Sequence, residues 1–245
     1  MRIIEGLQAG LAALTRSSST RTPELGATAA RRTADLFGER LTAAEAVQRI
    51  VDDVRHNGDA AVRDYAKRID GSDLPSFELP GADWSTIASS LPDETMDALR
   101  TAADRIRQYH KASMPEDWLD KDAGYGLRNV PLERIGLYAP GGTAAYPSTV
   151  LMGAIPAKVA GVDEVVLCTP DPTAATLAAA SLSGVDRVFR IGGAQAIAAM
   201  AFGTETVPRV DKICGPGNVF VSIAKHLVYG QVDIDGLFGP TETVV

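Results

Sequence analysis

Apolar and polar positions follow a helical period through the first half of the chain. The strongest pattern runs from Thr42 to about His56, where four apolar residues fall on one helical face: Val47, Ile50, Val51 and Val54. Thr42 and Glu45 form a capping box at its start, and Asn57-Gly58 marks its end. A second helix is predicted over residues 59–69, a short strand over 76–79 and a long amphipathic helix over 92–113. Residues 116–130 are expected to form an irregular or hairpin connection.

After Glu133 the pattern changes to short apolar runs that alternate with alanine-rich helical stretches. Strands are predicted over 134–138, 164–168, 187–191 and 212–214, and helices over 147–160, 172–182, 194–202 and 218–228. This alternation predicts the α/β class, with a parallel sheet covered on both faces and every strand-to-helix loop at one edge. Ligands bind at that edge in open α/β sheets.

Composition excludes several classes of function. The 245 residues are 45% hydrophobic and 22% charged, as in ordinary globular proteins, and the net charge of −7 argues against a generic nucleic-acid binder. No apolar run reaches the ~18 residues that span a bilayer, and the first 14 residues do not form a secretory signal. The stretch TRSSSTRTPELGATAARR is interpreted as an exposed arm or loop, with a transit peptide as the alternative, so a cytoplasmic location is the default.

Cysteines and histidines offer little metal chemistry. Cys168 and Cys214 lie in predicted buried strands and are interpreted as reduced core thiols. The histidines, at positions 56, 110 and 226, stand at no metal-binding spacing, and the chain has no Cys-x-x-Cys motif. A zinc site built from this chain alone is therefore not expected.

Three glycine-containing loops carry the candidate chemistry: residues 138–148, 192–195 and 215–218. Each follows a predicted strand and opens a helix, where backbone N–H groups can approach a diphosphate. Gln195 and Asn218 are placed to contact sugar or nicotinamide groups, and Tyr138 is placed to stack on a ring. The alternative is that the glycines serve only tight turns, but three such loops at one edge favour a nucleotide or anion site. Neither the Gly-x-Gly-x-x-Gly fingerprint nor a P-loop is present.

Other charged residues are weaker candidates. Lys158 and Lys225 are expected on solvated helix faces. Asp233 and Asp235 are either a pair for acid–base work or two carboxylates that meet solvent. No Ser-His-Asp or Cys-His arrangement is argued from the sequence.

At these loops the sequence resembles the histidinol dehydrogenase family. The resemblance is carried by RIGLYAPGGTAAYPSTVLMGAIPAKVAGVDEVVLCTP, by RIGGAQAIAAMAFGTETVPRVDKICGPGNVFVSIAKHLVYG and by VDIDGLFGPTETVV, and upstream by LTAAEAVQRIVDDVRHNGDAAVRDYAKRID. It covers nearly the whole chain from about residue 40. It implies a zinc-dependent homodimer that oxidises L-histidinol to L-histidine through L-histidinal with reduction of NAD, in histidine biosynthesis.

The resemblance also implies roles for particular residues. The family's NAD contacts fall on Tyr138, Gln195 and Asn218, and a substrate-contacting serine is replaced here by Thr241. In the family, the ligands of the zinc ion in each subunit and a Glu-His acid–base pair follow the motif that contains Thr241. Both the catalytic residues and the metal ligands are therefore expected beyond Val245, the last residue of the sequence. No residue of 1–245 is assigned to either role, and this chain is expected to lack full activity by itself.

The resemblance completes the expected domain organisation. Residues 1–40 are an N-terminal arm, and 41–130 are the N-terminal half of a first α/β domain. Residues 131–235 form a second, incomplete Rossmann-like domain that binds NAD, and 236–245 begin a return into the first domain. Because the chain stops in β-branched residues typical of a strand, we expect it to be part of a longer polypeptide.

Two alternatives remain open at this point. A related zinc and NAD dehydrogenase acting on another small amino- or sulfo-alcohol would carry the same loops. A non-catalytic nucleotide-binding fragment or dimerisation partner would need only the loops themselves. Substrate profiling of the complete enzyme distinguishes the first alternative from a histidinol dehydrogenase. Titration of NAD into residues 1–245 tests the second.

Overall fold

Helices dominate the N-terminal part of the chain. The structure is a computed structural model that describes residues 6–8, 27–73, 75–141 and 146–237. Its N-terminal elements are α2 (Ala27–Phe37), α3 (Ala43–Asp70), β1 (Glu78–Leu79), α4 (Gly81–Ala88) and α5 (Asp93–Ala112), followed by a hairpin of β2 (Trp118–Asp120) and β3 (Tyr125–Leu127). The strand predicted over 76–79 and the long helix predicted over 92–113 are thereby confirmed.

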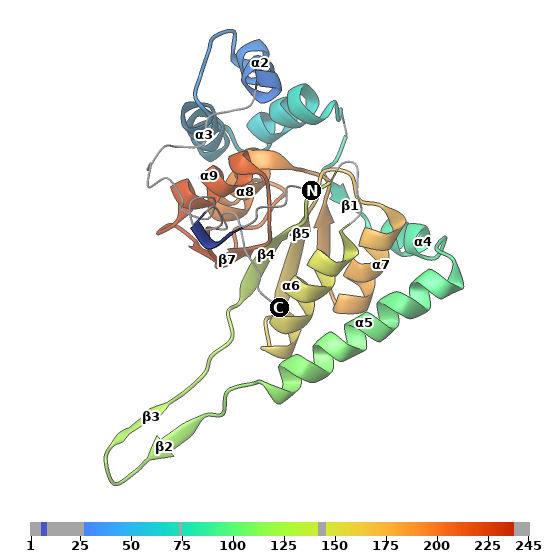
Figure 1. The fold of residues 1–245 in the computed structure, drawn as a ribbon, viewed down its shortest axis with the longest axis vertical. Coiled ribbons are helices and arrows are strands. Elements are labelled where there is room, and N and C mark those ends of the chain that lie inside the picture. The colour runs from blue at the N-terminus through green and yellow to red at the C-terminus, as the bar shows by residue number, and fades with distance from the viewer. Residues whose placement is uncertain (1–5, 9–26, 74, 142–145, 238–245) are drawn as a thin grey trace.

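Strands and helices alternate in the C-terminal part, as the sequence predicts. The elements are β4 (Arg134–Tyr138), α6 (Pro147–Val159), β5 (Glu164–Cys168), α7 (Ala174–Ser183), β6 (Arg187–Phe189), α8 (Gly193–Phe202), β7 (Lys212–Cys214), α9 (Val219–Val228) and β8 (Asp233–Ile234). The α/β class and the mostly parallel sheet are confirmed (Figure 1).

The sheet has the strand order β1-β6-β5-β4-β7-β8. The pairs β4–β5, β5–β6, β4–β7 and β7–β8 are parallel. From β4 the chain first builds β5 and β6 on one side, and then crosses back to build β7 and β8 on the other. Strand β1 differs, since it pairs antiparallel with β6 at the edge. It comes from outside the βαβ units, so no crossover connection fixes its direction.

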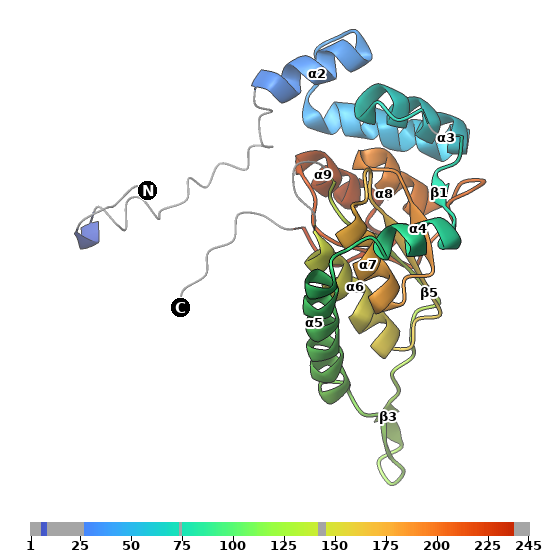
Figure 2. The same cartoon turned by 90° about the vertical axis from the view of Figure 1, so that its right-hand side faces the viewer.

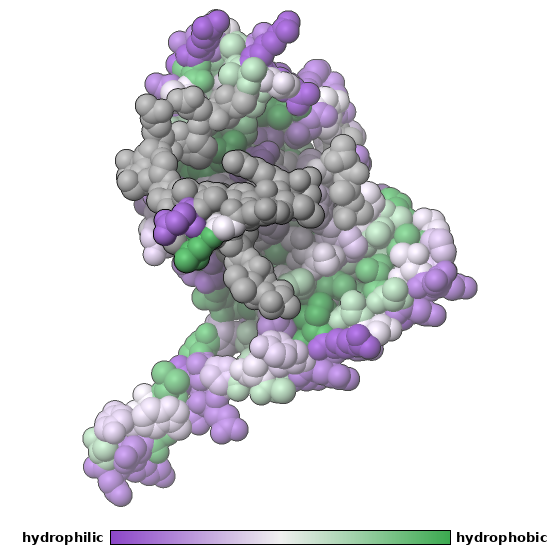
Figure 3. Space-filling model, viewed as in Figure 1, coloured by the Kyte–Doolittle hydropathy of each residue, from purple (hydrophilic) through white to green (hydrophobic). Residues whose placement is uncertain are grey.

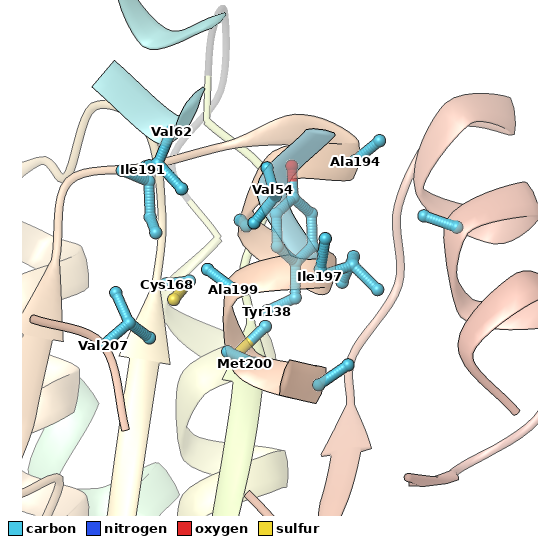
Figure 4. Packing of buried hydrophobic residues seen from close by; sticks show 14 of the residues in the cluster. Val54, Val62, Tyr138, Cys168, Ile191, Ala194, Ile197, Ala199, Met200 and Val207 are labelled. Carbon is cyan, nitrogen blue, oxygen red and sulfur yellow. The ribbon is translucent and has the colours of Figure 1, made fainter. Parts of the chain in front are cut away.

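Two cores lie on the two faces of the sheet. Successive residues of a strand point to opposite faces, so Val166 and Cys168 pack towards α3, α8 and α9, whereas Val165 and Leu167 pack towards α4–α7. Figure 4 shows part of the first core, in which Tyr138 and Cys168 lie among residues of α3 and α8. In Figure 2, α3 lies across α8 and α9. Helices therefore cover both faces, as predicted.

Helix α3 contains both helices predicted for this region. The capping box is present, with the Thr42 side chain accepting from the Glu45 N–H and a Glu45 carboxylate oxygen accepting from the Thr42 N–H at 2.8 Å. Gly58 interrupts the helix with φ 52° and ψ −132°. A change of direction at Asn57-Gly58, read from the sequence as an end and a new start, is confirmed as a kink.

Two helices were not expected. Residues 27–37, interpreted as part of an exposed arm, form α2, and this helix packs on α3 with the Phe37 and Tyr65 ring centroids 6.5 Å apart. Residues 81–88 form α4, which buries Trp84 in the second core. Both helices gain their stability from these apolar contacts more than from their own periodicity.

The connection predicted over 116–130 contains the β2–β3 hairpin, in which Trp118 is paired with Leu127. The hairpin stands clear of the body, with polar and apolar side chains at its surface (Figure 3). The Trp118 and Tyr125 rings pack edge to face, 5.7 Å apart, while both residues stay exposed. Within the part of the chain that the structure describes, no helix is both long and apolar enough to cross a membrane.

Candidate functional site

Three strand-to-helix loops meet at the carboxyl edge of the sheet. Because β4, β6 and β7 run parallel within the sheet, the loops after them share that edge, as predicted. Of the first loop, residues 142–145 lie outside the described residues. The strand order reverses between β4 and β7. Ligands of open α/β sheets bind at such points.

Tyr138, the last residue of β4, touches the other two loops. Its hydroxyl accepts a hydrogen bond from the Gly193 N–H at 3.1 Å. Its carbonyl oxygen lies so close to Gly215 that a Cβ on Gly215 would approach it to 2.0 Å. Gly215 also has φ +115°, which side chains rarely adopt. Tyr138 thus contacts both the loop after β6 and the loop after β7.

The ring of Tyr138 does not stack at the surface. It is only 4% exposed, because the alternation of β4 directs it into the core formed with α3 and α8 (Figure 4). The ring is thus not presented at the surface for stacking, and the expected contact between Tyr138 and NAD stays a prediction. Burial raises the pKa of the Tyr138 hydroxyl, and the hydrogen bond from Gly193 opposes that rise. The neutral hydroxyl instead fixes the start of α8.

Gln195 is fully buried in the first turn of α8. Its Nε2 donates to Asp70 Oδ2 at 3.3 Å, whereas its Oε1 has no hydrogen-bond partner among the described residues. Buried carbonyl oxygens are almost always paired, so this oxygen can accept a hydrogen from a bound molecule. Gly193 leaves room beside it, since a Cβ there would lie 2.7 Å from Oε1.

Asp70, at the end of α3, was not recognised from the sequence. Loss of hydration raises the pKa of its carboxyl group, and the hydrogen bond from Gln195 lowers it again. The carboxylate orients the Gln195 amide so that Nε2 faces α3 and Oε1 remains for another donor. No local motif indicates this role, since the two residues are far apart in sequence.

Asn218 is exposed and caps α9. Its Oδ1 accepts from the Phe220 and Val221 N–H groups at 3.0 and 3.1 Å. The Nδ2 donors of Asn218 take no part in this cap. The helix N-terminus carries a partial positive charge, so this loop presents donors to an anionic or carbonyl group.

The loop after β5 contributes a residue that sequence reasoning missed. Pro170 packs between the loops after β4 and β6. A Cβ added to Gly141 or to Gly192 would lie 2.7 Å from the Pro170 ring in each case. Only glycine lets these two backbones approach the ring so closely. A proline just after a buried strand at the same edge was the available signal.

Lys225 does not meet solvent as expected, although its partner Asp235 is partly exposed. Lys225 is only 2% exposed, and its ammonium forms an ion pair with Asp235. Asp233 pairs with Lys212 instead, at 2.7 Å. The expectation of a solvated Lys225 is therefore wrong, and the two aspartates do not form an acid–base pair, because each carboxylate is held by its own lysine.

Neither cysteine is in a disulfide, as predicted. Cys168 is buried and Cys214 is half-buried. Burial raises the pKa of both thiols, that of Cys214 to about 11. Within the described ranges, no three His, Cys, Asp or Glu side chains are grouped as a metal site requires.

Residues 238–245 lie outside the part of the chain that the structure describes. Thr241, the expected substrate contact, and Val245, the last residue, both lie outside the described residues. The expectation that the zinc ligands and the acid–base pair lie beyond Val245 therefore stays a prediction.

Comparison with known proteins identifies the family. The family model described as histidinol dehydrogenase matches residues 38–245. The chain belongs to the histidinol dehydrogenase family. This confirms the resemblance read from the sequence, and the family is one of oxidoreductases.

Several named histidinol dehydrogenases are similar over most of this chain. One from Dehalococcoides mccartyi is 50% identical over 207 residues, which are 82% of this chain and 48% of that protein. One from Aromatoleum aromaticum is 47% identical over 244 residues, with shares of 96% and 56%. The crystal structure of the enzyme from Elizabethkingia anophelis superimposes with a TM-score of 0.75 at 32% identity, over 83% of this chain and 49% of that one. The chain thus spans about half the length of the histidinol dehydrogenases it matches.

Proposed function

We propose that this chain provides the NAD-binding part of a histidinol dehydrogenase, which oxidises L-histidinol to L-histidine through L-histidinal in histidine biosynthesis. The observation that carries the proposal is the buried Gln195 Oε1, which has no partner among the described residues. The family's NAD contacts fall on this glutamine. Family membership supports the class of reaction, and the open acceptor supports a ligand with N–H or O–H donors.

The described residues fit NAD. Gln195 Oε1 suits a hydroxyl or carboxamide donor, and the Asn218 amide with the N-terminus of α9 suits phosphate or ribose oxygens. Tyr138 acts from within the core, where its hydroxyl holds Gly193 beside the glutamine. When bound, NAD supplies the acceptor for the hydride that leaves the substrate.

The described residues do not fit zinc. They bring together no set of three metal ligands. The resemblance alone supports a zinc ion in each subunit and a Glu-His acid–base pair, both from residues beyond Val245. It also supports contact between Thr241 and the substrate, and Thr241 retains the hydroxyl of the family's serine.

The same resemblance supports a homodimer that works in the cytoplasm on a small molecule. We infer neither a nucleic-acid partner nor a membrane partner. The net charge of −7 is unfavourable for binding nucleic acid. Sedimentation of the purified chain and of the native protein that contains these residues measures the oligomeric state directly.

Titration of NAD into the purified 245-residue chain tests the binding proposal. We expect saturable heat release with one NAD bound per chain, and no comparable signal with GTP as the control nucleotide. Equal signals for both nucleotides, or none for NAD, would refute an NAD site.

The reaction is tested on the native protein that contains these residues. It should reduce NAD in the presence of L-histidinol and lose activity with a chelator. A preference for another amino- or sulfo-alcohol would establish the related dehydrogenase instead. Binding of NAD without turnover of any such alcohol would establish a non-catalytic nucleotide binder.

A further inference from the structure

An ion pair with a buried lysine lies beside the loop of residues 215–218. Among the residues that the structure describes, Lys225 is the charged side chain with under a tenth of its surface exposed. Burying an ammonium group is unfavourable unless it is paired and hydrogen-bonded. The Lys225 side chain is 3% exposed and that of its partner Asp235 is 23% exposed. Such an arrangement calls for a physical explanation.

The pair holds both sides of one residue of the loop. Lys225 Nζ donates to the Gly215 carbonyl oxygen at 3.1 Å, and Asp235 Oδ2 accepts from the Gly215 N–H at 2.7 Å. The other oxygen of Asp235 binds the Lys225 ammonium. The N–H and C=O of Gly215 are therefore fixed by two side chains that also fix each other.

Each member of the pair is anchored in a different element. Lys225 lies on α9, about two turns after Asn218, which caps the same helix. Asp235 follows β8 directly, and its own N–H donates to the Ile213 carbonyl of β7 at 3.2 Å. The pair thus joins the helix after the loop to the sheet before it.

The ion pair fixes Gly215 in a conformation that other residues rarely adopt. Gly215 has φ +115°, and it lies against the Tyr138 carbonyl so closely that no Cβ fits. The backbone of Gly215 has no intrinsic preference for this conformation over others. The two side-chain hydrogen bonds hold it there.

We propose that Lys225 and Asp235 are positioning residues, which hold the loop of residues 215–218 so that Asn218 and the N-terminus of α9 are preorganised for the dinucleotide. The proposal rests on the proposed NAD site. Neither residue is assigned contact with the reacting atoms. They strengthen binding because the loop is already ordered, so that NAD binding does not bear the entropic cost of ordering it.

Lys225→Met is the direct test, and Lys212→Met is its matched control. Lys212 also pairs with an aspartate that lies in β8, but its pair is partly exposed and does not touch Gly215. We expect Lys225→Met to weaken NAD binding at least about tenfold, while Lys212→Met stays within about twofold of the unaltered chain. Equal affinity of a folded Lys225→Met chain and the unaltered chain would overturn the proposal.

A double variant separates positioning from stability. Lys225→Met leaves Asp235 without its cation, so the single variant is expected to be less stable. Lys225→Met with Asp235→Leu replaces the pair by apolar groups, a change that often restores stability. We expect its melting temperature to recover while its NAD affinity stays low. Recovery of both together would assign the pair a purely structural role and overturn the proposal.

Cys214 gives a readout that needs no NAD. It precedes Gly215, is half-buried, and is one of only two cysteines in the chain. Alkylation of Cys214 should be faster in the double variant than in the unaltered chain, because the loop beside it is no longer held. If the unaltered chain binds no NAD, the proposed function fails on that titration alone. Equal alkylation rates would then independently refute the positioning role.

Discussion

At the scale of single residues, the Gln195 side chain is expected to favour NAD binding and to lower the stability of the folded chain. Its buried Oε1 has no partner in the described structure and contributes desolvation cost to the folded state. Gln195→Met keeps the volume and removes this oxygen, so the free energy of unfolding should fall by less than about 1 kcal/mol or rise. The affinity for NAD should fall about tenfold, the effect of one lost hydrogen bond in a closed site. Urea unfolding and calorimetric titration measure the two quantities.

The control for this prediction is Gln48→Met on the exposed face of α3. Gln48 donates to Asp52 at 3.0 Å, so this variant also loses one side-chain hydrogen bond. It should leave NAD affinity unchanged. A large loss of stability in Gln195→Met, without a change in affinity, would show that the amide is a structural group only.

Gly215 is a second residue with a specific prediction. Gly215→Ala places a Cβ 2.0 Å from the Tyr138 oxygen at φ +115°, and should lower the free energy of unfolding by about 3 kcal/mol. Gly230→Ala is the control, because Gly230 has φ +94° but open space around its Cβ position. It should cost about 1 kcal/mol, from backbone strain alone. Similar urea midpoints for the two variants would contradict the close approach of β4 and the loop.

At the scale of elements, the kink in α3 has its own cap. The Asp59 N–H begins the second half of the helix and donates to Glu205 Oε2 at 2.8 Å. Glu205→Ala should therefore lower the free energy of unfolding by about 1 kcal/mol, the usual effect of losing a helix cap. The exposed Glu116→Ala is the control and should be neutral. Guanidinium unfolding followed by circular dichroism compares them, and equal midpoints would remove this role of Glu205.

The elements that the sequence predicts are those with strong local signals. The capping box of Thr42, the kink at Gly58 and the alternation after Glu133 are each visible within a few residues, and the structure confirms them. Helix α4 was missed because it is short and its stability comes from burying Trp84 against α7. Helix α2 was missed for a similar reason, since its aromatic contact is made with Tyr65 on another helix.

At the scale of the whole molecule, the missed site residues depend on long-range contacts. Asp70 meets Gln195 only because α3 lies over α8, and Lys225 is buried only because Asp235 returns beside it after β8. Periodicity along α9 treats a lysine as solvated, and no local pattern can indicate its partner. The carboxyl edge of the sheet was predictable from topology, whereas the network that stabilises it was not.

The whole molecule should also lose stability at alkaline pH. Burial raises the pKa of Cys214 from 9.0 to about 11, and burial together with Asp53 raises that of Tyr65 from 10.0 to about 12. The pKa of Cys168 is raised as well. Between the unfolded and folded pKa values the native state keeps protons that the unfolded chain has lost. The free energy of unfolding should therefore decrease from about pH 9 upwards.

Two variants divide this alkaline loss between its sources. Cys214→Ser should flatten the decrease in the free energy of unfolding that begins at about pH 9. Tyr65→Phe should flatten the part of that decrease that begins at about pH 10. Tyr109→Phe, at an exposed position on α5, should leave the curve unchanged. Urea unfolding at steps from about pH 8 to about pH 11 measures the slope in each case. If Tyr109→Phe and Tyr65→Phe gave the same curve, the Tyr65 hydroxyl would not be kept protonated by the core, and the burial of Tyr65 between α2 and the first core would need revision.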